Sequence, residues 1–84
     1  MTRQTEFQTT DLDLSAAIMT ATGRQPHILQ VSGQPLVSFQ FPNDETTMAI
    51  VISYASGDLV QPVKRFAACR TWLYRQARGR RHGA

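Results

Sequence analysis

Side chains that commonly carry catalytic chemistry are scarce in this sequence. It has two histidines, His27 and His82, and one cysteine, Cys69. Nucleophilic catalysis needs a nucleophile, a base and an orienting group within hydrogen-bond reach of one another. His82 falls in a basic terminal segment, His27 begins a predicted strand, and Cys69 has no base near it in the sequence. We interpret Cys69 as a small buried hydrophobe and expect that the protein is not an enzyme.

Acidic residues form two close pairs, Asp11-x-Asp13 and Asp44-Glu45. Both pairs stand at the starts of predicted helices, where carboxylates accept hydrogen bonds from free backbone N–H groups. A cation site would need further oxygen ligands, which the neighbouring sequence does not supply. Glycine-rich phosphate loops, zinc-protease motifs and CxxC pairs are also absent from the sequence. We therefore expect helix caps at these positions, with no metal and no cofactor.

Basic residues gather at one end of the chain. Residues 61–84 hold seven lysines and arginines and no acid, whereas residues 1–60 hold six acids and two arginines. Basic side chains beside an aromatic residue bind phosphates and stack on bases, and the same residue types dominate protein interfaces. A solvated helix with Trp72 packed on the neighbouring hairpin is the alternative. The candidate partner-binding residues are Lys64, Arg65, Trp72, Arg75, Arg78, Arg80 and Arg81.

Length and composition indicate one small domain. The chain has 84 residues, of which 42% are hydrophobic, enough for a single core. No apolar run approaches the roughly 20 residues of a membrane span. The segment MTRQTEFQTT lacks the apolar core of a secretion signal, so we expect a cytoplasmic protein. The predicted domain covers residues 1–79, and residues 80–84 are predicted to be a flexible basic tail.

The predicted sheet has three short strands. One is expected over residues 5–9, and the next two form a hairpin closed by SGQP, with Gly33 and Pro35 as turn residues. Alternating apolar residues predict that one face of the hairpin is buried. That face is expected to hold Leu29, Val31, Val37, Phe39 and Phe41.

The first helix is predicted over residues 12–22. Thr10 and Asp13 have the spacing of a capping box, and Asp11 is an alternative cap. Gly23 stands where a left-handed residue commonly ends a helix.

A second helix is favoured for residues 46–56, with a buried strand as the alternative. Asn43 or Asp44 can cap it, and Gly57 can end it. The predicted packing stripe is Met48, Val51, Ile52 and Ala55. Ile50 and Tyr54 would then be spare apolar surface that could serve a homodimer.

The third helix is predicted from Pro62 to Arg78, ended by Gly79. Arg70 falls on its apolar side, so we expect it to reach solvent along its own stem or to pair with Asp58, Asp44 or a partner's carboxylate. The expected apolar side holds Val63, Phe66, Ala67, Leu73, Tyr74 and Ala77. The order β-α-β-β-α-α predicts a two-layer α+β fold, in which helices pack on a small antiparallel sheet and the C-terminal helix is long and amphipathic.

Aromatic, glycine and proline residues form a recognisable pattern. The pattern comprises TTDLDLSAAIMTATG, Phe39 and Phe41 before Pro42, Tyr54-x-x-Gly57-x-Leu59-x-x-Pro62-x-x-x-Phe66, and Leu73-Tyr74. It resembles a family of small uncharacterised bacterial and phage proteins, known only as a domain of unknown function. The resemblance covers about residues 6–76 and implies a compact α/β domain often met on phages and mobile elements. It brings no catalytic residues and does not extend to RGRRHGA.

These observations predict a small interaction protein. It would dock its basic C-terminal helix on a larger protein complex whose surface is acidic or normally receives nucleic acid. Phage-borne inhibitors such as anti-CRISPR proteins share this size and lack active sites. The alternative is a nucleic-acid-binding accessory protein that contacts phosphates through the same helix and tail.

Overall fold

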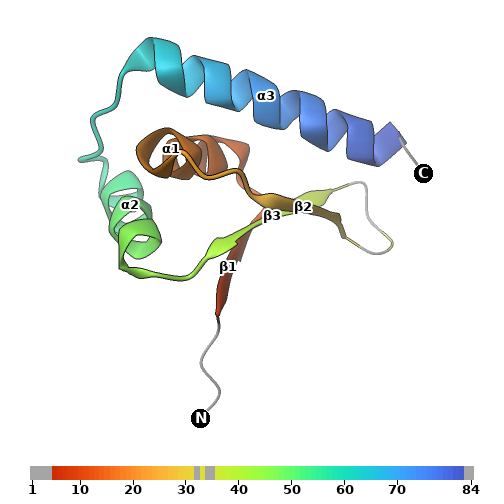
Figure 1. The fold of residues 1–84 in the computed structure, drawn as a ribbon, viewed down its shortest axis with the longest axis horizontal. Helices are drawn as coiled ribbons and strands as arrows, with labels where there is room; N and C mark the ends of the chain where they lie inside the picture. Colours follow the sequence, from red (N-terminus) through yellow and green to blue (C-terminus); the bar gives the residue numbers. More distant parts are fainter. Residues whose placement is uncertain (1–4, 32, 34–35, 83–84) are drawn as a thin grey trace.

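A three-stranded antiparallel sheet and three helices make up the fold (Figure 1). The structure is a computed structural model that describes residues 5–31, 33 and 36–82. In the last helix it describes side chains as far as residue 79. The order of the elements along the chain and the α+β class are those predicted from the sequence. Pro35 of the expected turn lies outside the described residues. The elements are β1 (Glu6–Thr9), α1 (Leu12–Thr22), β2 (His27–Gln30), β3 (Val37–Pro42), α2 (Glu45–Ser56) and α3 (Val63–His82).

The sheet has the order β1-β3-β2, so the last strand in sequence is central. Phe7 of β1 lies opposite Phe41, and Ile28 of β2 lies opposite Phe39. Val37, Phe39 and Phe41 are buried, as predicted, and join residues of α1 and α3 in one core. Figure 1 shows α3 running along the top of the molecule, with α1 beneath it and the sheet below and to the right of α1.

The predicted inward face of β2 is wrong by one residue. Ile28 is buried, whereas Leu29 is 46% exposed. Because side chains alternate along a strand, pairing Ile28 with Phe39 turns Leu29 to the opposite face. Val31 follows the strand and is half-buried, and its N–H donates to the carbonyl of Leu36 across the hairpin.

The bounds of α1 are those predicted, but its cap is the alternative one. Oδ1 of Asp11 accepts a hydrogen bond from the N–H of Leu14 at 3.0 Å, so the predicted Thr10–Asp13 capping box is wrong. Gly23 ends the helix with φ 72°, in the left-handed region where a side chain is disfavoured. Ser15, Ala16 and Ala17 are all buried, because these small residues let α1 approach both α2 and α3 closely.

Residues 45–56 are helical, which confirms the favoured alternative over a strand. Asp44 caps α2 by accepting from the N–H of Thr47 at 2.9 Å, and Gly57 ends it at φ 78°. The predicted packing stripe is largely wrong, since Met48, Ile52 and Ala55 are exposed and only Val51 is partly buried. The side that meets the core holds Thr47, Ile50, Val51 and Tyr54.

Two corrections concern α3. The helix continues through Gly79 to His82, so the predicted stop is wrong. A glycine inside a helix costs only about 1 kcal/mol relative to alanine, and no proline follows to break the backbone. The packing stripe is also rotated from the prediction, because Val63, Ala67 and Tyr74 are exposed. The residues that pack are Phe66, Cys69, Trp72, Leu73 and Ala77.

Candidate binding surface on the last helix

The outer side of α3 carries cations that point away from the core. Its buried centre is Leu73, with Phe66 and Ala77 on the same side. At about 100° per residue, Lys64, Arg75 and Arg78 fall within roughly 60° of one another, on the side opposite Leu73. All three are exposed. We call these three residues the outer basic face.

The outer basic face makes no ion pair within the described residues. Among the described residues, ion pairs join only Arg24 to Asp44 and Arg70 to Asp13. None involves Lys64, Arg75 or Arg78, so these cations are free to meet a partner.

Arg70 is a structural residue. Its Nε donates to Oδ1 of Asp13 at 2.5 Å and so ties α3 to α1. The expected internal pair is therefore confirmed, but its partner is neither Asp58 nor Asp44. Asp44 instead accepts from Nη1 of Arg24 at 2.6 Å. The N–H of Thr47, followed by Arg24, lowers the pKa of Asp44 to about 2.

The remaining candidates differ in how available they are. Trp72 is half-buried and packs against the core, and it borders β2 beside Pro26 and Ile28. This is the packing expected for the solvated-helix alternative. Arg65 is exposed and lies on the same side of α3 as Trp72, about 100° around the helix from Lys64. Arg80 and Arg81 continue the helix, but their side chains lie outside the described residues.

Comparison of the chain with protein-family models, with curated proteins and with solved structures finds no match. Within residues 5–31, 33 and 36–82, no cluster of three or more histidine, cysteine or acidic side chains is placed to hold a metal ion. No helix in the same part of the chain is long and apolar enough to cross a membrane.

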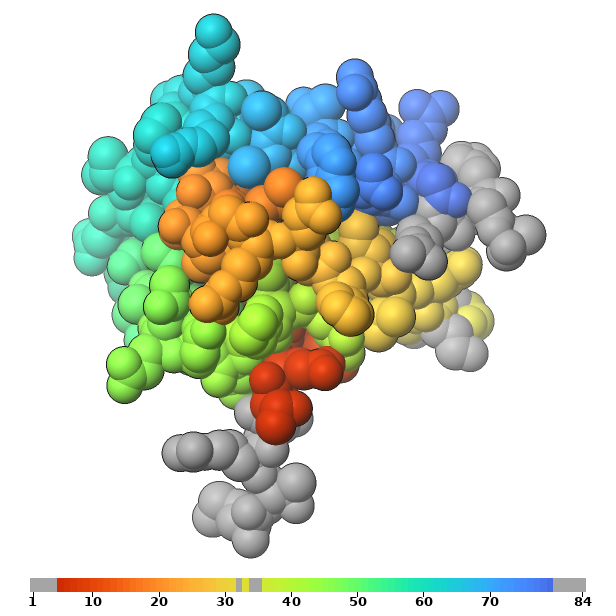
Figure 2. All heavy atoms as spheres, in the orientation of Figure 1, coloured from red at the N-terminus to blue at the C-terminus, as the bar shows by residue number. Residues whose placement is uncertain are grey.

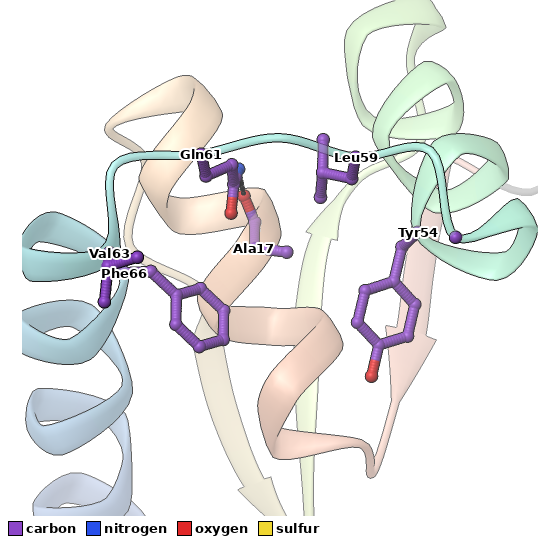
Figure 3. A pocket seen from close by; sticks show the side chains of 7 residues that line it. Ala17, Tyr54, Leu59, Gln61, Val63 and Phe66 are labelled. Carbon is purple, nitrogen blue, oxygen red and sulfur yellow. Dashed lines mark hydrogen bonds between the residues drawn. The ribbon is translucent and has the colours of Figure 1, made fainter.

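The structure also has a hollow that sequence reasoning missed. Tyr54 of α2 and Phe66 of α3 lie on either side of α1, and the connection between α2 and α3 passes above them (Figure 3). The hollow has a volume of about 280 Å³. Nε2 of Gln61 donates to the carbonyl of Ala17 at 2.8 Å and fixes this connection to α1. No local pattern signals the hollow, because it arises where α2 and α3 both pack on α1.

Tyr54, which lines the hollow together with Gln61, also makes a polar contact with the N-cap of α1. The hydroxyl of Tyr54 donates to Oδ2 of Asp11 at 3.4 Å. Burial, followed by the negative charges of Asp11 and Asp13, raises the pKa of Tyr54. The hydroxyl therefore stays protonated at neutral pH and acts as a hydrogen-bond donor, while the rest of the hollow is mostly apolar.

Proposed function

We propose that this protein is a non-enzymatic binding module that docks the outer basic face of α3 on an acidic surface of a larger protein complex. The observation that supports the proposal is the unpaired state of Lys64, Arg75 and Arg78 on a helix side opposite the core. Arginine is well suited to this role because its planar guanidinium binds carboxylates through two hydrogen bonds.

The surface that a partner would offer has a defined chemistry. Lys64 and Arg78 are 14 residues apart, so the outer basic face extends about 21 Å along the helix. A row of carboxylates or a groove that normally receives nucleic acid would complement it. An inhibitor carried by a phage or mobile element, which blocks such a groove, is the form of binding module that we propose.

Capture experiments with two matched variants test the proposal. Arg75→Gln/Arg78→Gln removes two positive charges from the outer basic face. Thr46→Glu/Ala49→Glu changes the net charge equally at exposed positions of α2. After nuclease treatment of the source-cell lysate, one defined protein should be captured by the wild type and the α2 control, and lost with the α3 variant. Equal capture by all three proteins would refute the proposal.

Binding to duplex nucleic acid through phosphates is the second candidate, favoured by the three exposed cations that share one side of α3. Each phosphate contact contributes about −0.9 to the slope of log affinity against log salt. If this function holds, Arg75→Gln/Arg78→Gln should make the slope for a short duplex DNA shallower by about 1.8. An unchanged slope would exclude the outer basic face as a phosphate-binding surface.

A further inference from the structure

The most exposed large apolar residues lie at the connection between α2 and α3. Val60 is 91% exposed and Val63 is 81% exposed, the highest values among the large hydrophobic residues described. Ile52, on the outer side of α2, is also exposed. In Figures 1 and 2 this connection lies at the end of the molecule opposite the β2–β3 hairpin. Val60 and Val63 are three residues apart in sequence, and so high an exposure of two neighbouring large apolar residues makes this end of the molecule a candidate interface.

A hollow and a protruding side chain share this surface. Leu59 and Val63 line the hollow, while Val60, between them in sequence, stands almost fully in solvent. Tyr54 and Phe66 extend the apolar lining on either side of α1 (Figure 3). The surface therefore offers both an apolar group to insert and a recess of about 280 Å³ to receive one.

The charges around these valines are arranged with opposite signs. Asp58 precedes Val60, and Lys64 and Arg65 follow Val63. Asp58 and Arg65 are exposed, and neither makes an ion pair within the described residues. The first turn of α3 contains no acidic residue, so the positive end of this helix is not neutralised there.

We propose that this end of the molecule binds a second copy of the same chain. A two-fold axis requires one surface to complement itself. An antiparallel approach centred between Val60 and Val63 would bring Asp58 of each copy to Arg65 of the other. It would also direct Val60 of each copy toward the hollow of the other. We call Asp58, Val60, Val63, Arg65 and the adjoining hollow the dimer surface.

Charge complementarity favours a second copy over an unrelated partner. An apolar peptide would cover the valines but would leave Asp58 and Arg65 without opposite charges. A symmetric dimer pairs both charges twice. It would also bring two outer basic faces into one particle, which strengthens binding to a partner that offers two sites.

Sedimentation velocity over a wide range of protein concentration tests this inference. The wild type should shift from monomer to dimer as concentration rises. Val60→Asp should weaken the dimer by about tenfold or more, because it places a charge against apolar surface. Leu29→Asp makes the same kind of change on the exposed face of the sheet and should dimerise as the wild type does. A wild type that stays monomeric, or a Val60→Asp variant that dimerises normally, would overturn the inference.

A charge exchange tests the arrangement itself. Asp58→Arg and Arg65→Asp should each weaken self-association, because each places like charges together at both contacts. Mixing the two variants should restore a dimer, since both contacts then join opposite charges. Failure of the mixture to associate better than either variant alone contradicts the two-fold arrangement. Capture of a partner by monomeric Val60→Asp would leave the proposed function intact, so the two proposals fail separately.

Discussion

Arg70 of α3 and Asp13 of α1 form an ion pair across 57 residues of sequence, with Nε 2.5 Å from Oδ1. The pair holds one side of α3 against α1. Leu73 is buried, so Arg75 and Arg78 project on the side of the helix opposite Leu73. The ion pair is therefore linked to the orientation of the candidate binding surface.

The first prediction concerns the strength of this pair. The two side chains are 47% and 51% exposed, so solvent screens their attraction. A double-mutant cycle with Arg70→Ala and Asp13→Asn, measured by urea unfolding, should give a coupling free energy of about 0.2–1 kcal/mol. Arg78→Ala combined with Asp13→Asn is the matched control and should be additive. Equal coupling in both cycles would mean that Arg70 is no closer to Asp13 than Arg78 is.

The second prediction concerns the packed side of α3. Leu73 is fully buried, whereas the adjacent Tyr74 is 44% exposed. Leu73→Ala should lower the free energy of unfolding by about 2–5 kcal/mol, through lost burial and the cavity that remains. Tyr74→Ala should have a clearly smaller effect in the same urea titration. The reverse ranking would show that Tyr74, and not Leu73, is the buried residue of this pair.

The third prediction concerns which side chains of β2 face the core. Ile28→Asp places a charge in the core opposite Phe39 and should unfold the protein, as followed by circular dichroism. Leu29→Asp should be tolerated because its side chain is directed to the exposed face. A folded Ile28→Asp protein together with an unfolded Leu29→Asp protein would shift the strand register by one residue.

The fourth prediction concerns acid sensitivity. Hydrogen bonding by Thr47 N–H, followed by Arg24, lowers the pKa of Asp44 from 3.8 to about 2. A carboxylate with a depressed folded-state pKa stabilises the protein above its unfolded-state pKa, and this contribution disappears as pH falls from 3.8 towards 2. Asp44→Asn keeps a capping acceptor but cannot titrate. The difference in urea midpoint between wild type and variant should therefore shrink over that interval. A difference that is constant with pH would contradict the assigned pKa shift.

Element boundaries were largely predictable because they depend on local chemistry. Asp44 and Gly57 bracket α2 in sequence, and both act as the expected caps. The buried faces were less predictable, since they depend on where neighbouring elements lie. Packing on α1 turns Ile50 and Tyr54 inward and leaves Ile52 exposed, although all three are apolar enough for a core.

The candidate surface also has features that the sequence predicts and features that it does not. The concentration of positive charge in residues 61–84 is visible in the sequence. The ion-pair partner of Arg70 is not visible in the sequence, because Asp13 becomes its neighbour only when α3 packs on α1. The hollow beneath Leu59 likewise depends on three helices meeting at one place.

The most direct measurement for the central claim is the affinity of the captured partner for wild type and Arg75→Gln/Arg78→Gln, by calorimetry at two salt concentrations. If the outer basic face is the docking surface, the variant should bind about tenfold or more weakly and depend less on salt, while Thr46→Glu/Ala49→Glu binds as the wild type does. If the Arg75→Gln/Arg78→Gln variant binds with the same affinity and the same salt dependence as the wild type, the outer basic face is not the docking surface.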